Sequence, residues 1–520
     1  MCNRVILAVA LAGFACSGMA APGKKASDHT WHAPQLAPSG SSLQTSGVAR
    51  TLGGSPHDLD PDPNFGYGTG QMVYGLGHAN APREEGLRVY AMDGGAGWYV
   101  LARHQRQDGG WDAVVLQVNP SGEAVDEFLV QTPLYIVDAV MDPDTGKFYF
   151  VGSGHPPALP GNDSDFGVIC VDITIPPDGG TCAGFGTVGT AWVGFNLGGD
   201  NYDGAMRVVV RPNIGLILAG IAFDANKSYV AVASLYRASG ALYTPFGTNG
   251  RLVKAINATS PATQSDVEAM VLSNDPDAQA RVYIAGSYSV DDAGDNTDGY
   301  VLALKAMTGA PDTSFNGDGI QAVTLDPIAC STTCRNDQLT ALAVQADGKL
   351  ALAGFVWPEA VLAKPLLGGA GTGDDTVIQP MLGRLNVDGS FDLNFHSTGL
   401  FSVGSNWPGH GGITPQAIAE RPGKHDLLVA MKYRTTTNWN VPPLQLLGQW
   451  SPDGNTLRAT ASFAFGVAEP LSPEVEPRSL LVDANSAMMV GSRRWLSDDW
   501  DITLVRTLVD QDFLFSDGFE

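Results

Sequence analysis

Residues 339–354 read LTALAVQADGKLALAG, and residues 381–403 read MLGRLNVDGSFDLNFHSTGLFSV. These stretches contain four short apolar runs separated by turn residues. Asp347-Gly348 and Asp388-Gly389 are dipeptides that readily adopt the positive φ angles of tight hairpins. Phe395 and Gly399 precede the fourth run. We therefore predict four antiparallel strands that form one sheet.

The same order of runs and turns recurs along the chain, at 87–131, 135–197, 206–256, 267–325 and 417–465. The turn before the fourth run reappears as FGTVG at 185–189, FGTNG at 246–250 and FNGDG at 315–319. Four strands in a period of about 50 to 75 residues are typical of a β-propeller blade. An open β-solenoid, two tandem β-sandwiches, and a ring of six or eight blades are the alternatives.

The last repeat is incomplete, because runs at 479–482, 487–490 and 502–505 have no fourth partner. The missing piece stands near the other end, where DPNFGYGTG at 62–70 precedes QMVYGL at 71–76. Pairing this strand with the final repeat would close a ring and leave no exposed sheet edge there. We predict an all-β, seven-bladed propeller of four-stranded antiparallel blades, closed by an N-terminal strand.

The composition is turn-rich and acidic, with 63 Gly and 33 Pro among 520 residues and a net charge of −24. Charged residues make up only 16%, against roughly 25% in average soluble domains. These values exclude a long coiled coil and a basic nucleic-acid binder. Repulsion from phosphates disfavours nucleic acids and anionic lipid surfaces. We expect a monomer without a membrane span.

Residues 1–21, MCNRVILAVALAGFACSGMAA, combine Arg4, an apolar stretch and small residues at the end. This pattern predicts a signal peptide and export to the periplasm, the cell surface or the medium. Cys16 leaves a lipid anchor as an alternative. We expect a flexible leader at 22–60, the propeller at 61–509 and a C-terminal tail at 510–520.

Four further cysteines fit an oxidising compartment. Their spacing suggests one disulfide between Cys170 and Cys182 and another between Cys330 and Cys334. A zinc site is disfavoured, because no second Cys or His pair stands near the last two.

An acidic stretch, DDAGDNTDG at 291–299, offers Asp291, Asp295 and Asp298 as oxygen ligands for calcium. The stretch lacks the spacing of an EF-hand loop. Acidic residues recur at equivalent places, which favours a role in turns and strand entry. We expect no other cofactor or metal.

The best-formed repeat resembles the delta-60 repeat family of exported bacterial proteins. The resemblance is carried by LAVQADGK at 342–349, Gly354, RLN at 384–386 and DGSFD at 388–392. It implies export and a β-propeller without an assigned activity. It supplies no catalytic residues.

The long connections all fall on one face of the predicted ring, which is therefore the expected binding surface. Trp111, Trp357, Trp407 and Trp439 lie in or beside these connections. Each could present a flat ring to a glycan or a protein, or fold down as a lid over its blade. We expect an exported non-enzymatic β-propeller that acts as a binding or surface interaction module. A polysaccharide-acting hydrolase or lyase is the alternative, and no catalytic residue is assigned from sequence.

Overall fold

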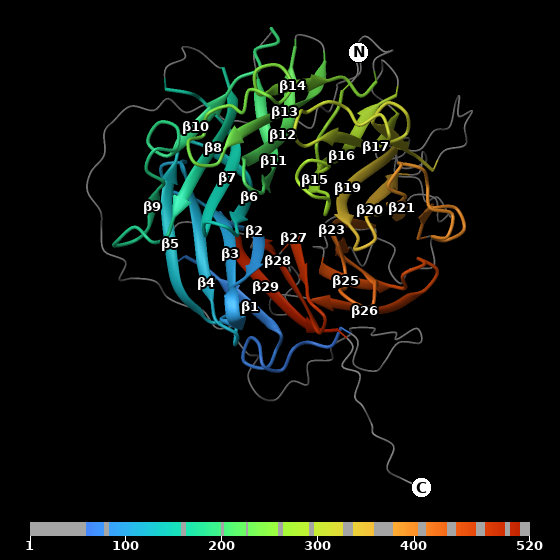
Figure 1. The fold of residues 1–520 in the computed structure, drawn as a ribbon. Helices are drawn as coiled ribbons and strands as arrows, with labels where there is room; N and C mark the ends of the chain where they lie inside the picture. Colours follow the sequence, from blue (N-terminus) through green and yellow to red (C-terminus); the bar gives the residue numbers. More distant parts are fainter. Residues whose placement is uncertain are drawn as a thin grey trace, which may run out of the picture.

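The computed structural model describes residues 59–76, 83–157, 163–198, 202–224, 227–257, 264–290, 296–325, 336–357, 378–403, 412–433, 444–463, 474–494 and 500–509. These residues form seven antiparallel sheets around a central axis (Figure 1). The described part contains a single short helix, η1 (Asp93–Gly95). The prediction of a seven-bladed all-β propeller is confirmed.

Each blade has four main strands, which in blades 1 to 6 follow sequence order from the axis outward, and blade 2 has an additional two-residue strand, β9. Blade 1 contains β2 (Glu84–Ala91), β3 (Trp98–Gln105), β4 (Trp111–Val118) and β5 (Ala124–Thr132). Blade 2 contains β6 (Tyr135–Asp142), β7 (Lys147–Gly154), β8 (Asp165–Asp172), β9 (Gly180–Thr181) and β10 (Thr190–Val193). Blade 3 contains β11 (Asp203–Arg211), β12 (Gly215–Phe223), β13 (Ser228–Tyr236) and β14 (Arg251–Lys254).

Blade 4 contains β15 (Ala269–Leu272), β16 (Arg281–Ser289), β17 (Thr297–Lys305) and β18 (Ile320–Val323). Blade 5 contains β19 (Asn336–Val344), β20 (Leu350–Trp357), β21 (Gln379–Leu385) and β22 (Leu400–Ser402). Blade 6 contains β23 (Ile413–Glu420), β24 (Leu427–Tyr433), β25 (Leu444–Trp450) and β26 (Leu457–Phe463). We call the end of the ring where one blade connects to the next the upper end. The hairpin turns between first and second strands mark the lower end.

Blade 7 joins the two ends of the propeller. Its inner strands are β27 (Glu474–Val482), β28 (Ser486–Arg494) and β29 (Trp500–Leu508), and its outer strand is β1 (Gln71–Tyr74). β1 pairs antiparallel with β29, with Gln71 opposite Val505. The predicted closure by an N-terminal strand is therefore confirmed, and it gives the outermost position of this blade to the chain's first strand.

A buried phenylalanine and the residue after it connect neighbouring blades at the lower end. In blade 3, Gly247 donates its N–H to the carbonyl oxygen of Thr308 in blade 4 at 2.7 Å. The ring of Phe246, 0% exposed, packs against Gly309, where an added Cβ would lie 2.8 Å from a ring carbon. The Phe-x-x-x-Gly turn is thus a fastener between blades. The same contact occurs between Phe65 and Gly122, Phe185 and Gly240, Phe315 and Gly389, and Phe395 and Gly454.

The innermost strands carry a β-bulge that directs additional side chains toward the axis. In β19, Thr340 stands unpaired beside Gly354, and an added Cβ on that glycine would lie 2.0 Å from the carbonyl oxygen of Gln338. Glycine is required there because the inner backbone approaches so closely. Arg478 occupies the equivalent bulge in β27. Further bulges lie at Leu87, Val137, Met206 and Gln416.

The hydrophobic core lies between blades. One cluster of fully or nearly fully buried side chains, for example, combines Met72 of β1, Val114 of blade 1 and Ile502 of blade 7. Burying apolar surface in this way is the main force that holds the sheets together. Since each blade shares its core with two neighbours, the ring is stabilised as a whole once it is closed.

Candidate functional site

The inner strands β2, β6, β11, β15, β19, β23 and β27 surround an axial channel. Its upper section is a cavity of about 100 Å3, and its lower section is a wider hollow of about 610 Å3. Met270, Leu342 and Ile418 line both sections, so these are successive parts of one passage. The lower section is mostly apolar, with walls such as Val271, Leu272 and Val344.

The upper section is lined by charged side chains that the bulges direct inward. Arg88 of blade 1 and Asp138 of blade 2 form an ion pair, with Nε and Oδ1 2.7 Å apart. Arg207 of blade 3 contacts the Glu268 carboxylate at 3.3 Å and donates from Nε to the Glu268 carbonyl oxygen at 2.6 Å. Charged groups from blades 1 to 4 therefore follow one another around the axis.

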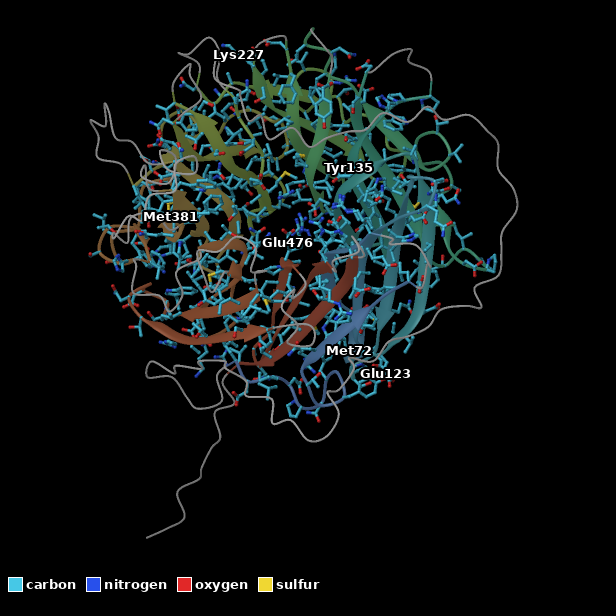
Figure 2. The ribbon with its side chains drawn as sticks, turned by 180° about the vertical axis from the view of Figure 1, so that it is seen from behind. Met72, Glu123, Tyr135, Lys227, Met381 and Glu476 are labelled. Carbon is cyan, nitrogen blue, oxygen red and sulfur yellow. A yellow bond between two sulfur atoms is a disulfide. The ribbon has the colours of Figure 1, made fainter. Side chains whose placement is uncertain are left out.

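Arg478 extends this set to blades 7 and 1. Its Nη2 lies 3.5 Å from Oε2 of Glu85 and 3.4 Å from Oε2 of Glu476. Glu476 stands at the inner edge of its blade in Figure 2. Burial alone would raise the pKa of both carboxyls, but Arg103 and Arg478 hold the pKa of Glu85 below its usual value. Arg478 and Lys432 do the same for Glu476.

Asp266 behaves in the opposite way. It precedes Glu268 by two residues at the entrance to β15, and its Oδ2 accepts a hydrogen bond from the Ser287 hydroxyl at 2.6 Å. Burial, followed by repulsion from Glu268, raises the pKa of Asp266 to about 7. Carboxyls with lowered pKa values, Glu85 and Glu476, and one carboxyl with a raised pKa, Asp266, therefore stand near the charged lining of the upper section.

The tryptophans singled out from the sequence are placed differently. Trp111 is 8% exposed and packs edge-on against Tyr135, with ring centroids 5.3 Å apart. The Arg103 guanidinium lies 4.9 Å from the Trp111 ring centroid, so this indole faces protein groups. Trp357 is partly buried at the end of β20, and its ring centroid lies 6.1 Å from that of Phe355. Trp407 and Trp439 lie outside the described residues.

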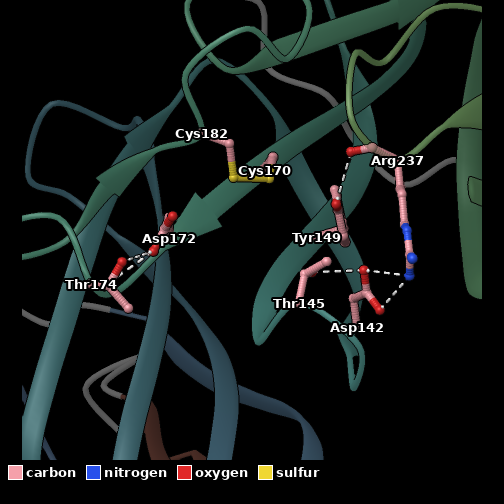
Figure 3. The surroundings of a disulfide bond; sticks show 8 residues. All are labelled: Asp142, Thr145, Tyr149, Cys170, Asp172, Thr174, Cys182 and Arg237. Atoms are coloured by element: carbon pink, nitrogen blue, oxygen red, sulfur yellow. Dashed lines mark hydrogen bonds and ion pairs between the residues drawn. A yellow bond between two sulfur atoms is a disulfide. The ribbon is translucent and has the colours of Figure 1, made fainter.

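One predicted disulfide is present. Cys170 on β8 is bonded to Cys182 (Figure 3). Nearby, the Tyr149 hydroxyl donates to the carbonyl oxygen of Arg237, whose guanidinium binds the carboxylate of Asp142. This region therefore joins blade 2 to blade 3. Cys330 and Cys334 lie outside the described residues, and their pairing stays a prediction.

The calcium stretch is described only in part. Asp291 and Asp295 fall outside the described residues, while Asp298 lies on β17 opposite Tyr288. Burial, and then the Asp298 carboxylate, raise the pKa of Tyr288 to about 12. Within the described ranges, no group of three or more His, Cys, Asp or Glu side chains is placed to hold a metal ion. No helix in the described part is long and apolar enough to cross a membrane.

No protein-family model matches this chain, and neither does any curated protein. Solved structures with a similar backbone fold include the polysaccharide lyase Uly1, at 9% identity and a TM-score of 0.43. The match covers 84% of this chain and 92% of that chain. A protein of unknown function from Dyadobacter fermentans shares 11% identity with a TM-score of 0.36, covering 88% of this chain and 99% of that one.

The Bombyx mori GH32 β-fructofuranosidase BmSUC1 is also similar, at 11% identity and a TM-score of 0.27, covering 83% of this chain and 90% of that chain. The functional conclusion therefore has to come from this chain's own side chains.

Proposed function

We propose that this protein is a polysaccharide-acting enzyme that cleaves glycosidic bonds by hydrolysis at the upper section of the axial channel. The observation that carries the proposal is the pair formed by Asp266 and Glu268. Burial and the neighbouring Glu268 raise the pKa of Asp266 to about 7, and Glu268 is bound by Arg207. Two carboxyl groups in contrasting environments are the usual equipment of a glycoside hydrolase.

The backbone favours this pairing. Asp266 and Glu268 both donate N–H groups to the neighbouring strand β16, to Ser287 at 3.0 Å and Ala285 at 2.8 Å. The segment is therefore extended, and two residues along an extended strand span about 6.6 Å. Side chains two apart point to the same side. The two carboxyls can therefore approach one substrate from the same side of the segment.

In this scheme Asp266 donates its proton to the departing glycosidic oxygen. Glu268 stabilises the positive charge that develops on the sugar or takes a proton from the attacking water. The Ser287 hydroxyl can donate or accept, so it can stay bonded to Asp266 in either protonation state. Arg88 and Arg478 also face the cavity, where they can donate hydrogen bonds to sugar oxygens.

A second pair supports the same location. Both Glu85 and Glu476 contact one nitrogen of Arg478, at 3.5 and 3.4 Å. Their nearest oxygens therefore lie within about 7 Å of each other, a separation compatible with paired carboxylates in glycosidases. Since arginines keep both ionised, this pair suits substrate orientation better than proton donation.

This proposal departs from the non-enzymatic binding module expected from the loop tryptophans. Trp111 is buried against Tyr135, while Asp138 and Glu268 line the axial cavity. Binding without turnover remains the competing outcome, and the experiment separates the two.

The test is release of reducing ends from a panel of neutral and acidic polysaccharides. We expect activity on at least one polymer, lost in Asp266→Asn and Glu268→Gln. Asp318→Asn is the control, because Asp318 is an exposed turn residue of the same blade whose carboxylate accepts only a local N–H in the described contacts. Absence of turnover across the panel, or full activity in both site variants, would refute the proposal.

A further inference from the structure

Two aspartates at the upper end of blades 2 and 3 are buried with unpartnered oxygens. Asp165, the first residue of β8, is 4% exposed, and Asp203, the first residue of β11, is 0% exposed. In each, Oδ1 is buried and accepts no hydrogen bond. An ionised oxygen in that position is costly unless something positive or a donor reaches it.

The backbone brings these two residues together although they are 38 positions apart. Asp203 donates its N–H to the carbonyl oxygen of Ser164, directly before Asp165, at 2.6 Å. Asp203 also accepts N–H bonds through Oδ2 from Phe195 at 2.6 Å and from Asn196 at 3.4 Å.

Asp165 reaches the same segment. Its Oδ1 lies 2.7 Å from the position that a Cβ on Gly194 would occupy. Both carboxylates therefore meet at the chain between Gly194 and Asn196, with one Oδ1 each left over.

The surrounding charges do not neutralise the carboxylates of Asp165 and Asp203. Asp163, whose Oδ1 is also buried without a partner, adds a third negative group beside them. Burial first, and then Asp163, raise the pKa of Asp165 to about 6, although Arg251 and His155 act against the shift. Burial also raises the pKa of Asp203 to about 6, and Asp165 adds to it.

Capping does not explain both aspartates. Asp337 stands at the corresponding place of blade 5, and its Oδ2 accepts the Leu325 N–H at 2.8 Å and the Thr324 hydroxyl at 2.7 Å. One carboxylate per blade junction is enough for that task. At the junction of blades 2 and 3, Asp165 is a second buried carboxylate that capping does not use.

We propose that Asp165 and Asp203 bind a hard divalent cation, Ca2+, between blades 2 and 3. Two carboxylate oxygens would be the charged ligands, and backbone oxygens and water would complete the shell, as is common for calcium. Asp163 adds negative charge beside the ion. This site is separate from residues 291–298 and does not depend on the proposed hydrolase activity. Its role is to fix residues 194–196 and Asp203 against β8.

The experiment uses the full chain, dialysed free of metal, and follows thermal unfolding while Ca2+ or Mg2+ is added. We expect the midpoint to rise with Ca2+ concentration, and to rise less with Mg2+, which prefers a regular octahedral shell with more water. Tb3+ gives a second readout, because Trp192 on β10 lies two residues before Gly194 and can sensitise its luminescence.

Asp165→Asn and Asp203→Asn should each weaken Tb3+ and Ca2+ binding at least about tenfold, the lower end of what losing even an outer partner costs a metal site. Asp337→Asn is the matched control, since it removes a comparable cap at another junction, and it should leave the response unchanged. The proposal is overturned if wild type shows no Ca2+-dependent shift, or if Asp337→Asn loses the response equally. It is also overturned if both site variants bind Tb3+ as wild type does.

Discussion

Replacing Phe65 with alanine tests whether the N-terminal segment closes the ring. Phe65 is 0% exposed and stands just before β1. Its ring packs against Gly122 of blade 1 and lies 5.8 Å, edge-on, from the ring of Trp98. The residue after it, Gly66, donates its N–H to the Ser121 carbonyl oxygen at 2.9 Å. Phe65 therefore attaches the closing strand to the next blade.

The expected cost follows from burial. Truncating a fully buried phenylalanine removes its apolar contacts and leaves a cavity, which costs about 3–5 kcal/mol. Domains are stable by only roughly 5–15 kcal/mol, so the free energy of unfolding should fall by a large share. At the corresponding fastener in blade 4, Phe315→Ala should cost a similar amount, because Phe315 is also 0% exposed.

The two variants should differ in where the structure loosens. Blade 4 is one continuous stretch of chain, whereas blade 7 obtains its outer strand β1 from the other end of the chain, through non-covalent contacts with β29. Phe65→Ala should therefore speed amide exchange in Gln71–Tyr74 selectively. Urea unfolding followed by tryptophan fluorescence gives the free energy, and hydrogen exchange gives the location.

Tyr67→Ala is the control in the same segment, because Tyr67 is 68% exposed. It should change the free energy of unfolding by no more than about 0.5 kcal/mol. The closure argument fails if Phe65→Ala unfolds like wild type, or if β1 exchanges equally fast in Phe65→Ala and Phe315→Ala. Deleting residues 62–76 should lower the unfolding temperature further than either substitution.

Three more expectations can be checked. Because the folded pKa of Asp266 is raised to about 7, turnover should fall as pH rises through 7. The free energy of unfolding should also fall as pH rises from about 4 to 7, since the folded state binds the proton more tightly than the unfolded chain does. In a pH series of urea titrations, Asp266→Asn should lose this dependence. Gly354→Ala should destabilise by roughly 1–3 kcal/mol, measured by urea unfolding, because its Cβ would meet the Gln338 carbonyl oxygen at 2.0 Å; an unchanged midpoint would contradict the close approach. Reducing the disulfide between Cys170 and Cys182, which closes a loop of sequence separation 12, should cost about 2–4 kcal/mol, seen as a lower unfolding temperature that a Cys170→Ser variant no longer shows on reduction.

The candidate site was largely out of reach of sequence reasoning. Arg88, Asp138, Arg207 and Glu268 each stand in a short apolar run of the sequence, where a single charged residue has no distinctive local signal. They become a site only in the ring, where β-bulges lie beside the first three and Glu268 joins them from the segment before β15. The signal that could have found them is a charged or polar residue that recurs at the bulge or directly after it in the innermost strands.

Trp111 shows how the surroundings of a side chain depend on the neighbouring blade. Trp111 sits beside a Gly-rich turn, a context that favours exposure, but it is also the first residue of β4. In the sheet its indole lies against Tyr135 of the next blade and near the Arg103 guanidinium. Which neighbour covers a side chain depends on the adjacent blade, and residue spacing along the chain carries no information on that.

The amino-acid order alone determined the repeat, its hairpin turns, the Phe-x-x-x-Gly fastener and the return of the first strand to the last blade. These features are local, since Gly and Asp-Gly set backbone angles wherever they stand and alternating apolar residues make a strand anywhere. Tertiary structure alone decided the raised pKa of Asp266 and the proximity of Asp165 to Asp203. Both depend on burial and on charges contributed by distant segments, and electrostatic energy depends on distance through space rather than along the chain.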